Sequence, residues 1–227
     1  MGKIKTLSKI LFVFVGILLL TTSCDWIFGD PSELTEDVHN IIPSDILEEF
    51  KNLGIEIHGG KKPPKIEGTY KISPCVLVKS NFSDTYSVGY VFTDKVITFS
   101  RQNNAKLTVV CDYVQGQEKG DGIGSFITGN GNKFSIYSEI NGTLHDEPFK
   151  SVFIYSGEIS TDGIINYHEA LMVTMENRYT IRRGQGRLFK DSDGLAEKTT
   201  QTRLQDMMEI STEEQKPEAL TNTQKAY

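Results

Sequence analysis

Between residues 65 and 190 the chain repeats a two-residue alternation of apolar and polar side chains, and this pattern constrains the fold more than any other feature. Alternation of this kind is typical of strands that bury one face. The apolar sets include Leu107, Val109, Cys111 and Tyr113, then Phe134, Ile136 and Ile140, and also Val88, Tyr90 and Phe92.

Turn signals separate these segments at short intervals. Asn141-Gly142 and Asp162-Gly163 are dipeptides favoured in two-residue hairpins. No helical segment lies between the strands, so the crossovers that parallel pairing needs are missing. The sequence therefore predicts a mainly β fold, an antiparallel meander of about eight to ten strands. Closure into a barrel would remove the free edges, and a two-sheet sandwich is the alternative.

We expect one short helix before the first strand. Ser44 is the expected N-cap, and Gly54 is the expected left-handed residue that ends the helix. Between them, one apolar stripe is formed by Ile46, Leu47, Phe50 and Leu53.

The first 23 residues have the pattern of an export signal. Three lysines precede an apolar run, Ile10 to Leu20, and small residues then lead to Cys24. The run is too short to span a bilayer, which takes about 20 residues. Cys24 stands where a bacterial lipobox places its cysteine, although Thr21 holds a position at which that pattern prefers an aliphatic residue. We expect cleavage before Cys24 and acyl chains such as palmitate on it, which anchor the chain to a membrane.

Charge is distributed unevenly along the chain. The whole chain has a net charge of −6, and the acidic excess lies in residues 25–41 and 191–227, whereas residues 42–190 hold 17 acidic and 17 basic side chains. A neutral domain argues against nucleic acid as a partner, because nucleic acid requires a basic face. The acidic stretch after Cys24 is repelled by anionic headgroups and should hold the domain away from the bilayer.

These features predict four regions. They are a signal peptide (1–23), an acidic tether (24–41), a helix plus β-barrel domain (42–195), and an acidic, largely disordered tail (196–227).

Cys75 and Cys111 are the two cysteines that remain after Cys24. Both lie in strand-like segments, and an exported chain reaches a compartment that permits disulfides. A disulfide between them and a pair of buried free thiols are the two alternatives. No C-x-x-C pair accompanies them, so we expect no metal site, and no motif points to a cofactor.

Residues 66–70 resemble the G-x-W opening of lipocalin-type barrels, with Tyr70 in the place of the tryptophan. The alternative is a glycine at the start of an ordinary strand. If the barrel holds a small apolar ligand, we expect aromatic side chains to line it, and a packed core is the other interpretation of the same alternation. The candidate lining residues are Tyr70, Tyr90, Phe92, Tyr113 and Tyr137.

Five segments together resemble a group of functionally uncharacterised lipoproteins from Bacteroides-like bacteria. The segments are residues 63–70, 73–74, 78–84, 89–92 and 186–195. The resemblance implies a lipidated Cys24, a location in the cell envelope at the outer membrane, and one β-rich, calycin-like domain. It implies no activity, and it leaves open whether the chain faces the periplasm or the cell surface.

Three classes of function fit these features. The first is a non-catalytic binding or accessory module for a small apolar ligand or for an envelope protein or glycan. The second is a structural or adhesin-like interaction protein. The third is a glycan hydrolase with paired carboxylates, for which Glu139, Glu158 and Glu169 are the candidates. Arg182 and Arg183, with Arg187 nearby, form the densest basic cluster, which suits an acidic glycan or a lipid headgroup, or is a solvated strand end.

Overall fold

The computed structural model describes residues 36–199, and strands make up most of that length. The prediction of a mainly β fold is therefore confirmed. Cys24, the export signal and the tail beyond residue 199 lie outside the described residues. The elements are α2 (Glu36–Ile41), α3 (Ser44–Leu53), β1 (Lys61–Lys62), β2 (Gly68–Ile72), β3 (Cys75–Ser80), β4 (Val91–Phe92), β5 (Lys95–Asn103), β6 (Thr108–Gln115), β7 (Glu118–Asn130), β8 (Lys133–Leu144), β9 (Glu147–Ile159), β10 (Gly163–Met175), β11 (Gly186–Asp191) and β12 (Leu195–Thr199).

All twelve strands belong to one sheet, so the two-sheet sandwich is not the observed arrangement. Strands β5 to β10 pair in sequence order, each antiparallel to the next. Strand β12 then pairs with both β10 and β2, and β2 pairs with β5, which closes a ring of eight strands. Strands β3 and β4 continue the sheet from β11, and β4 has a neighbour on one side only.

Ring closure depends on a close approach at the start of β10. Gly163 is paired with Glu197 of β12, and a Cβ atom built on Gly163 would lie 2.1 Å from the carbonyl oxygen of Ala196. Any side chain at this position would therefore collide with the backbone of β12. Glycine is required where two backbones approach so closely.

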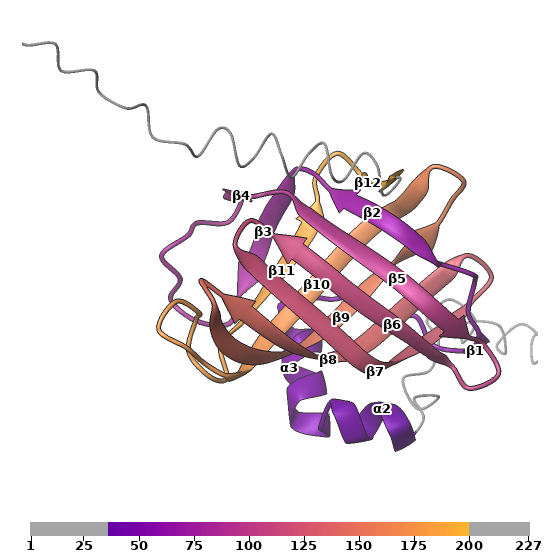
Figure 1. Cartoon of the computed structure of the whole chain (residues 1–227), viewed down its shortest axis with the longest axis horizontal. Coiled ribbons are helices and arrows are strands. Elements are labelled where there is room, and N and C mark those ends of the chain that lie inside the picture. Colours follow the sequence, from indigo (N-terminus) through magenta and orange to yellow (C-terminus); the bar gives the residue numbers. More distant parts are fainter. Residues whose placement is uncertain (1–35, 200–227) are drawn as a thin grey trace, which may run out of the picture.

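The sheet has an apolar cluster on each face. The interior cluster fills the ring with residues such as Tyr70, Phe99 and Phe153. The outer cluster lies between the helices and β8 to β11, and it includes Phe50, Tyr137 and Ile154. Figure 1 shows α2 and α3 on the outside of the ring.

Helix α3 forms where the sequence predicts it. Leu47, Phe50 and Leu53 are its buried residues, and they face the outer cluster. Gly54 has φ 100°, and its N–H donates to the carbonyl oxygens of Phe50 and Lys51, as expected for a left-handed C-cap. The predicted N-cap was wrong by one residue: Pro43 is the cap, no side chain caps the helix, and Ser44 is its first residue.

Three segments differ from the prediction. Helix α2 lies in the stretch expected to be an acidic tether. Val38 in this helix and Ile42 just after it are fully buried in the outer cluster, so this part of the chain packs on the sheet. The strand expected over residues 88–92 is reduced to β4, and residues 81–90 form a loop. Strand β12 extends the folded part to Thr199, beyond the expected boundary at 195.

Candidate functional site

The loops after β3, β6, β8 and β10 lie at one end of the ring, because successive strands of the meander run in opposite directions. We call this end the loop end. Its two long loops, residues 81–90 and 176–185, lie on the left in Figure 1. Asn81 joins them: its side chain donates to the carbonyl oxygen of Gly184 (3.2 Å) and accepts from the N–H of Gly186 (2.8 Å).

Beneath the loop end, five polar side chains meet inside the ring, and we call them the interior polar cluster. Lys95 Nζ lies 2.5 Å from Glu169 Oε1, and both side chains are 1% exposed. Tyr167 donates its hydroxyl proton to Glu169 Oε2 at 2.6 Å. Tyr113 donates to Glu118, and the Lys95 ammonium lies 4.3 Å from the centroid of the Tyr113 ring. These contacts occupy both oxygens of Glu169, whereas the partly exposed Glu118 connects the cluster to solvent.

Burial raises the pKa values of three members of this cluster, Tyr113, Tyr167 and Glu118. Burial raises the pKa of Tyr113 well above its usual value, and the negative charge of Glu118 adds to the effect. Burial and the charge of Glu169 do the same to the pKa of Tyr167. Burial also raises the pKa of Glu118, although Lys95 and the hydrogen bond from Tyr113 act against it. Both tyrosines are therefore neutral hydrogen-bond donors at every physiological pH.

The stability of the fold does not by itself explain the buried ion pair between Lys95 and Glu169. Replacing a buried pair with apolar side chains of similar size is often neutral or stabilising, because desolvation of both charges offsets their attraction. Charged clusters with shifted pKa values are more frequent at functional sites. The interior polar cluster is thus a candidate site, with Glu118 as its partly exposed member.

Sequence reasoning selected Glu169 and missed Lys95, Glu118 and Tyr167. A signal for Lys95 was present, because Lys95 is in phase with Ile97 and Phe99, and all three are buried on the same face of β5. A lysine in phase with buried apolar residues at the start of a strand can also lie at the solvated end, so alternation alone does not place it inside.

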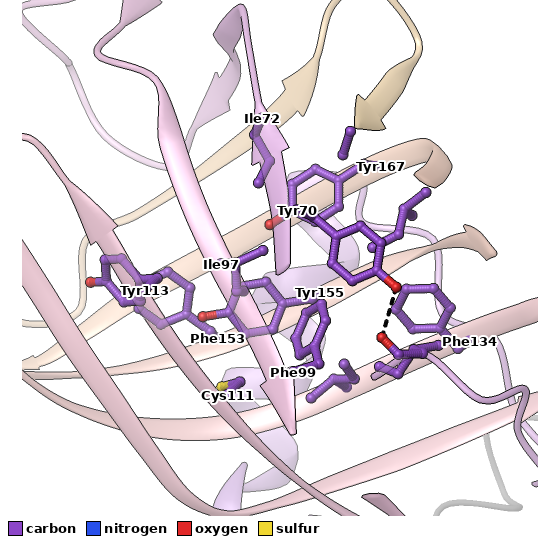
Figure 2. Packing of buried hydrophobic residues seen from close by; sticks show 14 of the residues in the cluster. Tyr70, Ile72, Ile97, Phe99, Cys111, Tyr113, Phe134, Phe153, Tyr155 and Tyr167 are labelled. Carbon is purple, nitrogen blue, oxygen red and sulfur yellow. Dashed lines mark hydrogen bonds between the residues drawn. The ribbon is translucent and has the colours of Figure 1, made fainter. Parts of the chain in front are cut away.

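Aromatic rings fill the interior between the two ends of the ring. Phe134 contacts Phe99, Phe99 contacts Tyr155, Tyr155 stacks on Phe153, and Phe153 contacts Tyr113, with centroid separations of 5.4–6.5 Å. Figure 2 shows most of these rings side by side, together with the hydrogen bond from Tyr70 to the carbonyl oxygen of Ile66. The packed-core interpretation of the alternation accounts for these contacts.

The five candidate lining residues occupy three environments. Tyr70 and Tyr113 lie in the interior cluster, and Phe92 packs against it. Tyr137 lies in the outer cluster, where it is buried beneath the helices and does not face the interior. Tyr90 is 44% exposed on the loop end.

Cys75 and Cys111 are both buried free thiols. The structure thus has the thiol alternative and not the disulfide. Burial raises the pKa of Cys75 to about 12 and also raises the pKa of Cys111. Thiols in this state are not nucleophiles, because the thiolate is the reactive form.

Large apolar side chains are exposed only at the loop end, within the part of the chain that the structure describes. Four belong to residues 81–92, namely Tyr86 (38%), Val88 (73%), Tyr90 (44%) and Val91 (57%), and two belong to the end of β10 and the loop that follows it, Met175 (40%) and Tyr179 (45%). Three arginines accompany them in the second loop, Arg178, Arg182 and Arg183. We call these nine residues the aromatic–arginine face.

An internal arginine holds the first loop in place. Arg187 donates to both oxygens of Asp84, from Nε at 2.7 Å and from Nη2 at 2.8 Å. The central carbon of its guanidinium also lies 5.2–5.7 Å from the ring centroids of Phe82, Tyr86 and Phe92. Burial favours a raised pKa for Asp84, but the hydrogen bonds from Arg187 and Ser80 outweigh it and lower the pKa.

The remaining sequence candidates do not assemble into a site. Glu139 pairs with Lys150 at the surface and Glu158 pairs with Lys133, so neither faces the interior with Glu169. Arg187, unlike the exposed Arg182 and Arg183 of the predicted basic cluster, is largely buried and bound to Asp84. Among residues 36–199, no group of three or more His, Cys, Asp or Glu side chains is arranged to hold a metal ion.

No helix among the described residues is long and apolar enough to cross a membrane.

No family model, curated protein or solved structure matches the chain. The resemblance to Bacteroides-type lipoproteins therefore stays a prediction.

Proposed function

We propose that the protein is a lipid-anchored module of the cell envelope, at the outer membrane, which binds another envelope component through the loop end of its ring. The observation that carries this proposal is the clustering of exposed apolar side chains on the aromatic–arginine face. Exposed apolar side chains gathered at one end of a molecule favour an interaction site there.

The proposed anchor is the lipid on Cys24, and the proposed form of the ring is a closed barrel. Pairing of β12 with both β10 and β2 supports the barrel. The aromatic contacts that fill its interior favour binding at the surface over carriage of a small apolar ligand inside.

A photocrosslinking experiment in cells that make the full chain tests the binding surface. A photoreactive phenylalanine derivative replaces Val88 in one variant and Lys106, exposed at the opposite end of the ring, in the matched control. We expect a discrete adduct from position 88 and none from position 106. Equal labelling at the two positions, or no adduct at position 88, would overturn the proposal.

Detergent phase separation tests the anchor. The unchanged chain should partition into the detergent phase, and the Cys24→Ala variant should leave it, because the acyl chains supply the membrane affinity. A Cys24→Ala protein that stays in the detergent phase would refute lipidation.

A second candidate function, a hydrolase, is favoured by one observation. Glu118 and Glu169 are two carboxylates in one interior cluster, and burial raises the pKa of Glu118. Two carboxyl groups in one site are the arrangement that glycoside hydrolysis uses. Against it, Lys95 and Tyr167 engage both oxygens of Glu169.

Assay of the purified chain for release of reducing ends from a panel of glycans separates the two candidates. The binding module predicts no turnover. Turnover that is lost in Glu118→Gln but kept in the surface variant Glu139→Gln would favour the hydrolase.

A further inference from the structure

Three aromatic rings from the first loop and β4 form a cluster of tilted rings and not a flat platform. Tyr86, Tyr90 and Phe92 contact one another with centroid separations of 4.4–4.9 Å, and their planes meet at 43–75°. A sugar ring stacks on one flat aromatic surface, whereas three mutually tilted rings present edges in different directions. The geometry therefore disfavours a stacked glycan at this position.

The most exposed apolar side chains of the face are aliphatic. Val88 is 73% exposed and Val91 is 57% exposed, on either side of Tyr90. A branched aliphatic side chain gains free energy only by burial against apolar atoms, at about 25 cal/mol per Å². The partner must offer an apolar recess that receives this projection.

The projection is fixed before any partner arrives. The double hydrogen bond between Arg187 and Asp84 holds the loop, and Arg187 is 14% exposed while Asp84 is 5% exposed. Ser80 Oγ also donates to Asp84 at 2.6 Å. A preformed contact loses little conformational entropy on binding, which favours affinity.

The second loop adds positive charge beside the projection. Residues 176–185 contain three arginines and one acidic residue, Glu176. Arg178 pairs with Glu147, but neither Arg182 nor Arg183 forms an ion pair with any carboxylate among residues 36–199. The backbone N–H of Arg183 donates to the Glu176 carboxylate, so one acidic group of the loop lies beside this residue. The exposed guanidinium groups of Arg182 and Arg183, which have no ion pair among the described residues, favour carboxylates on the partner, since arginine binds them with two parallel hydrogen bonds.

We infer that the aromatic–arginine face binds a protein whose surface has an apolar recess bordered by Asp and Glu side chains. Tyrosine, methionine and arginine, which make up most of the face, are the residue types enriched in protein–protein contacts. The inference rests on the proposed function and specifies the partner of the same surface.

Charge reversal combined with crosslinking at position 88 tests the inference. Arg182→Glu together with Arg183→Glu should lower the adduct yield roughly tenfold, because carboxylates would then face carboxylates. Arg182→Lys with Arg183→Lys keeps the charge and should retain most of the adduct. The matched control is Lys61→Glu with Lys62→Glu, an exposed basic pair on β1 at the opposite end of the ring, which should leave the yield unchanged.

Mass spectrometry of the adduct identifies the class of partner. A crosslinked peptide pair from an acidic segment supports the inference. A mass ladder spaced by sugar residues, a single lipid mass, or a protein adduct unaffected by the arginine reversal would overturn it while leaving the proposed function in place. Absence of any adduct at position 88 would overturn the proposed function itself.

Discussion

Lys95 and Glu169 carry opposite charges in a core of mostly aromatic and aliphatic side chains, and each is buried because the other is present. Their separation of 74 positions in the sequence shows why no local pattern reveals the pair. Glu169 also lies between Tyr167 and Leu171 on β10, so its position in the alternation matches that of a core residue. The individual positions could be predicted from phase, but their contact depends on the closed sheet.

Removing one member of this pair should be worse than removing both. Glu169→Gln leaves the Lys95 ammonium uncompensated and should lower the free energy of unfolding by about 3–5 kcal/mol. The double variant Lys95→Met, Glu169→Leu should recover most of that loss, as measured by urea unfolding. A double variant as unstable as Glu169→Gln would contradict this account of the pair.

Asp191 provides a pH dependence with a defined sign. Burial, then the hydrogen bond with Asp193, raises the pKa of Asp191 from 3.8 to about 6, while the pKa of Asp193 is lowered by the same hydrogen bond. Between pH 4 and 6 the folded state therefore holds a proton at Asp191 that the unfolded state has lost. The stability contributed by Asp191 is present at low pH and is lost as the pH rises through 6. Carboxyl NMR titration should place the midpoint of Asp191 at about pH 6; a midpoint at its ordinary value of 3.8 would disprove the shift.

At the scale of elements, the loop between β3 and β4 and the helix α2 are the parts that the sequence did not reveal. Val88, Tyr90 and Phe92 alternate as a strand would, but Val88 and Tyr90 are exposed, and the rings of Tyr90 and Phe92 pack on Tyr86 within the loop. Helix α2 could not be recognised from the sequence, because the stretch is acidic and has only two buried positions, Val38 and Ile42. Two positions are too few to reveal a helical period. Helix α3, with a full apolar stripe and a glycine cap, was predictable.

The conformation of the first loop depends on the planar guanidinium group of Arg187. Arg187→Lys keeps the charge but loses the planar pair of donors and the stacking on three rings. We expect a loss of about 1.5–3 kcal/mol in urea unfolding and faster proteolysis within residues 81–90. Arg178→Lys is the matched control, because Arg178 is 70% exposed in its ion pair with Glu147 and should change stability by less than about 1 kcal/mol. Equal effects of the two substitutions would contradict the role of Arg187.

Packing of the helices on the ring gives a prediction for the outer cluster. Ile42 is fully buried just after α2, and Ile42→Ala should cost about 2–5 kcal/mol in the free energy of unfolding. Glu49→Ala on the exposed side of α3 should change it by no more than about 0.5 kcal/mol. An unaffected Ile42→Ala protein would mean that α2 is not part of the stable domain.

For the molecule as a whole, periodicity and turn signals were sufficient to predict one antiparallel sheet with a helix before it. The barrel was predicted from the cost of free edges, but the strand that closes the ring was not, because β12 is only five residues long and its alternation is weak, with Ala196 as its one buried residue. The backbones of Gly163 and Ala196 pack closely together, and a pattern of hydrophobic residues does not reveal a contact between two backbones.

Truncation tests how much the closure matters. A chain that ends at Thr199 should keep the melting temperature of the full chain, whereas one that ends at Asp191 loses β12 and should lose the cooperative transition, because β2 and β10 then have unpaired edges. Circular dichroism on heating measures both. A sharp transition in the shorter chain would show that the ring is stable when open.

Pairing of β2 with β12 also has a consequence for biosynthesis. The ribosome makes Thr69 early and Thr199 late, yet the two are register partners. One edge of β2 stays unpaired until β12 has been synthesised. Pairing between strands so far apart in the sequence slows folding. A cell that makes this chain has to protect a nascent, half-formed sheet from other nascent chains until the final strand emerges, so its yield should depend on chaperone supply more than its final stability would suggest.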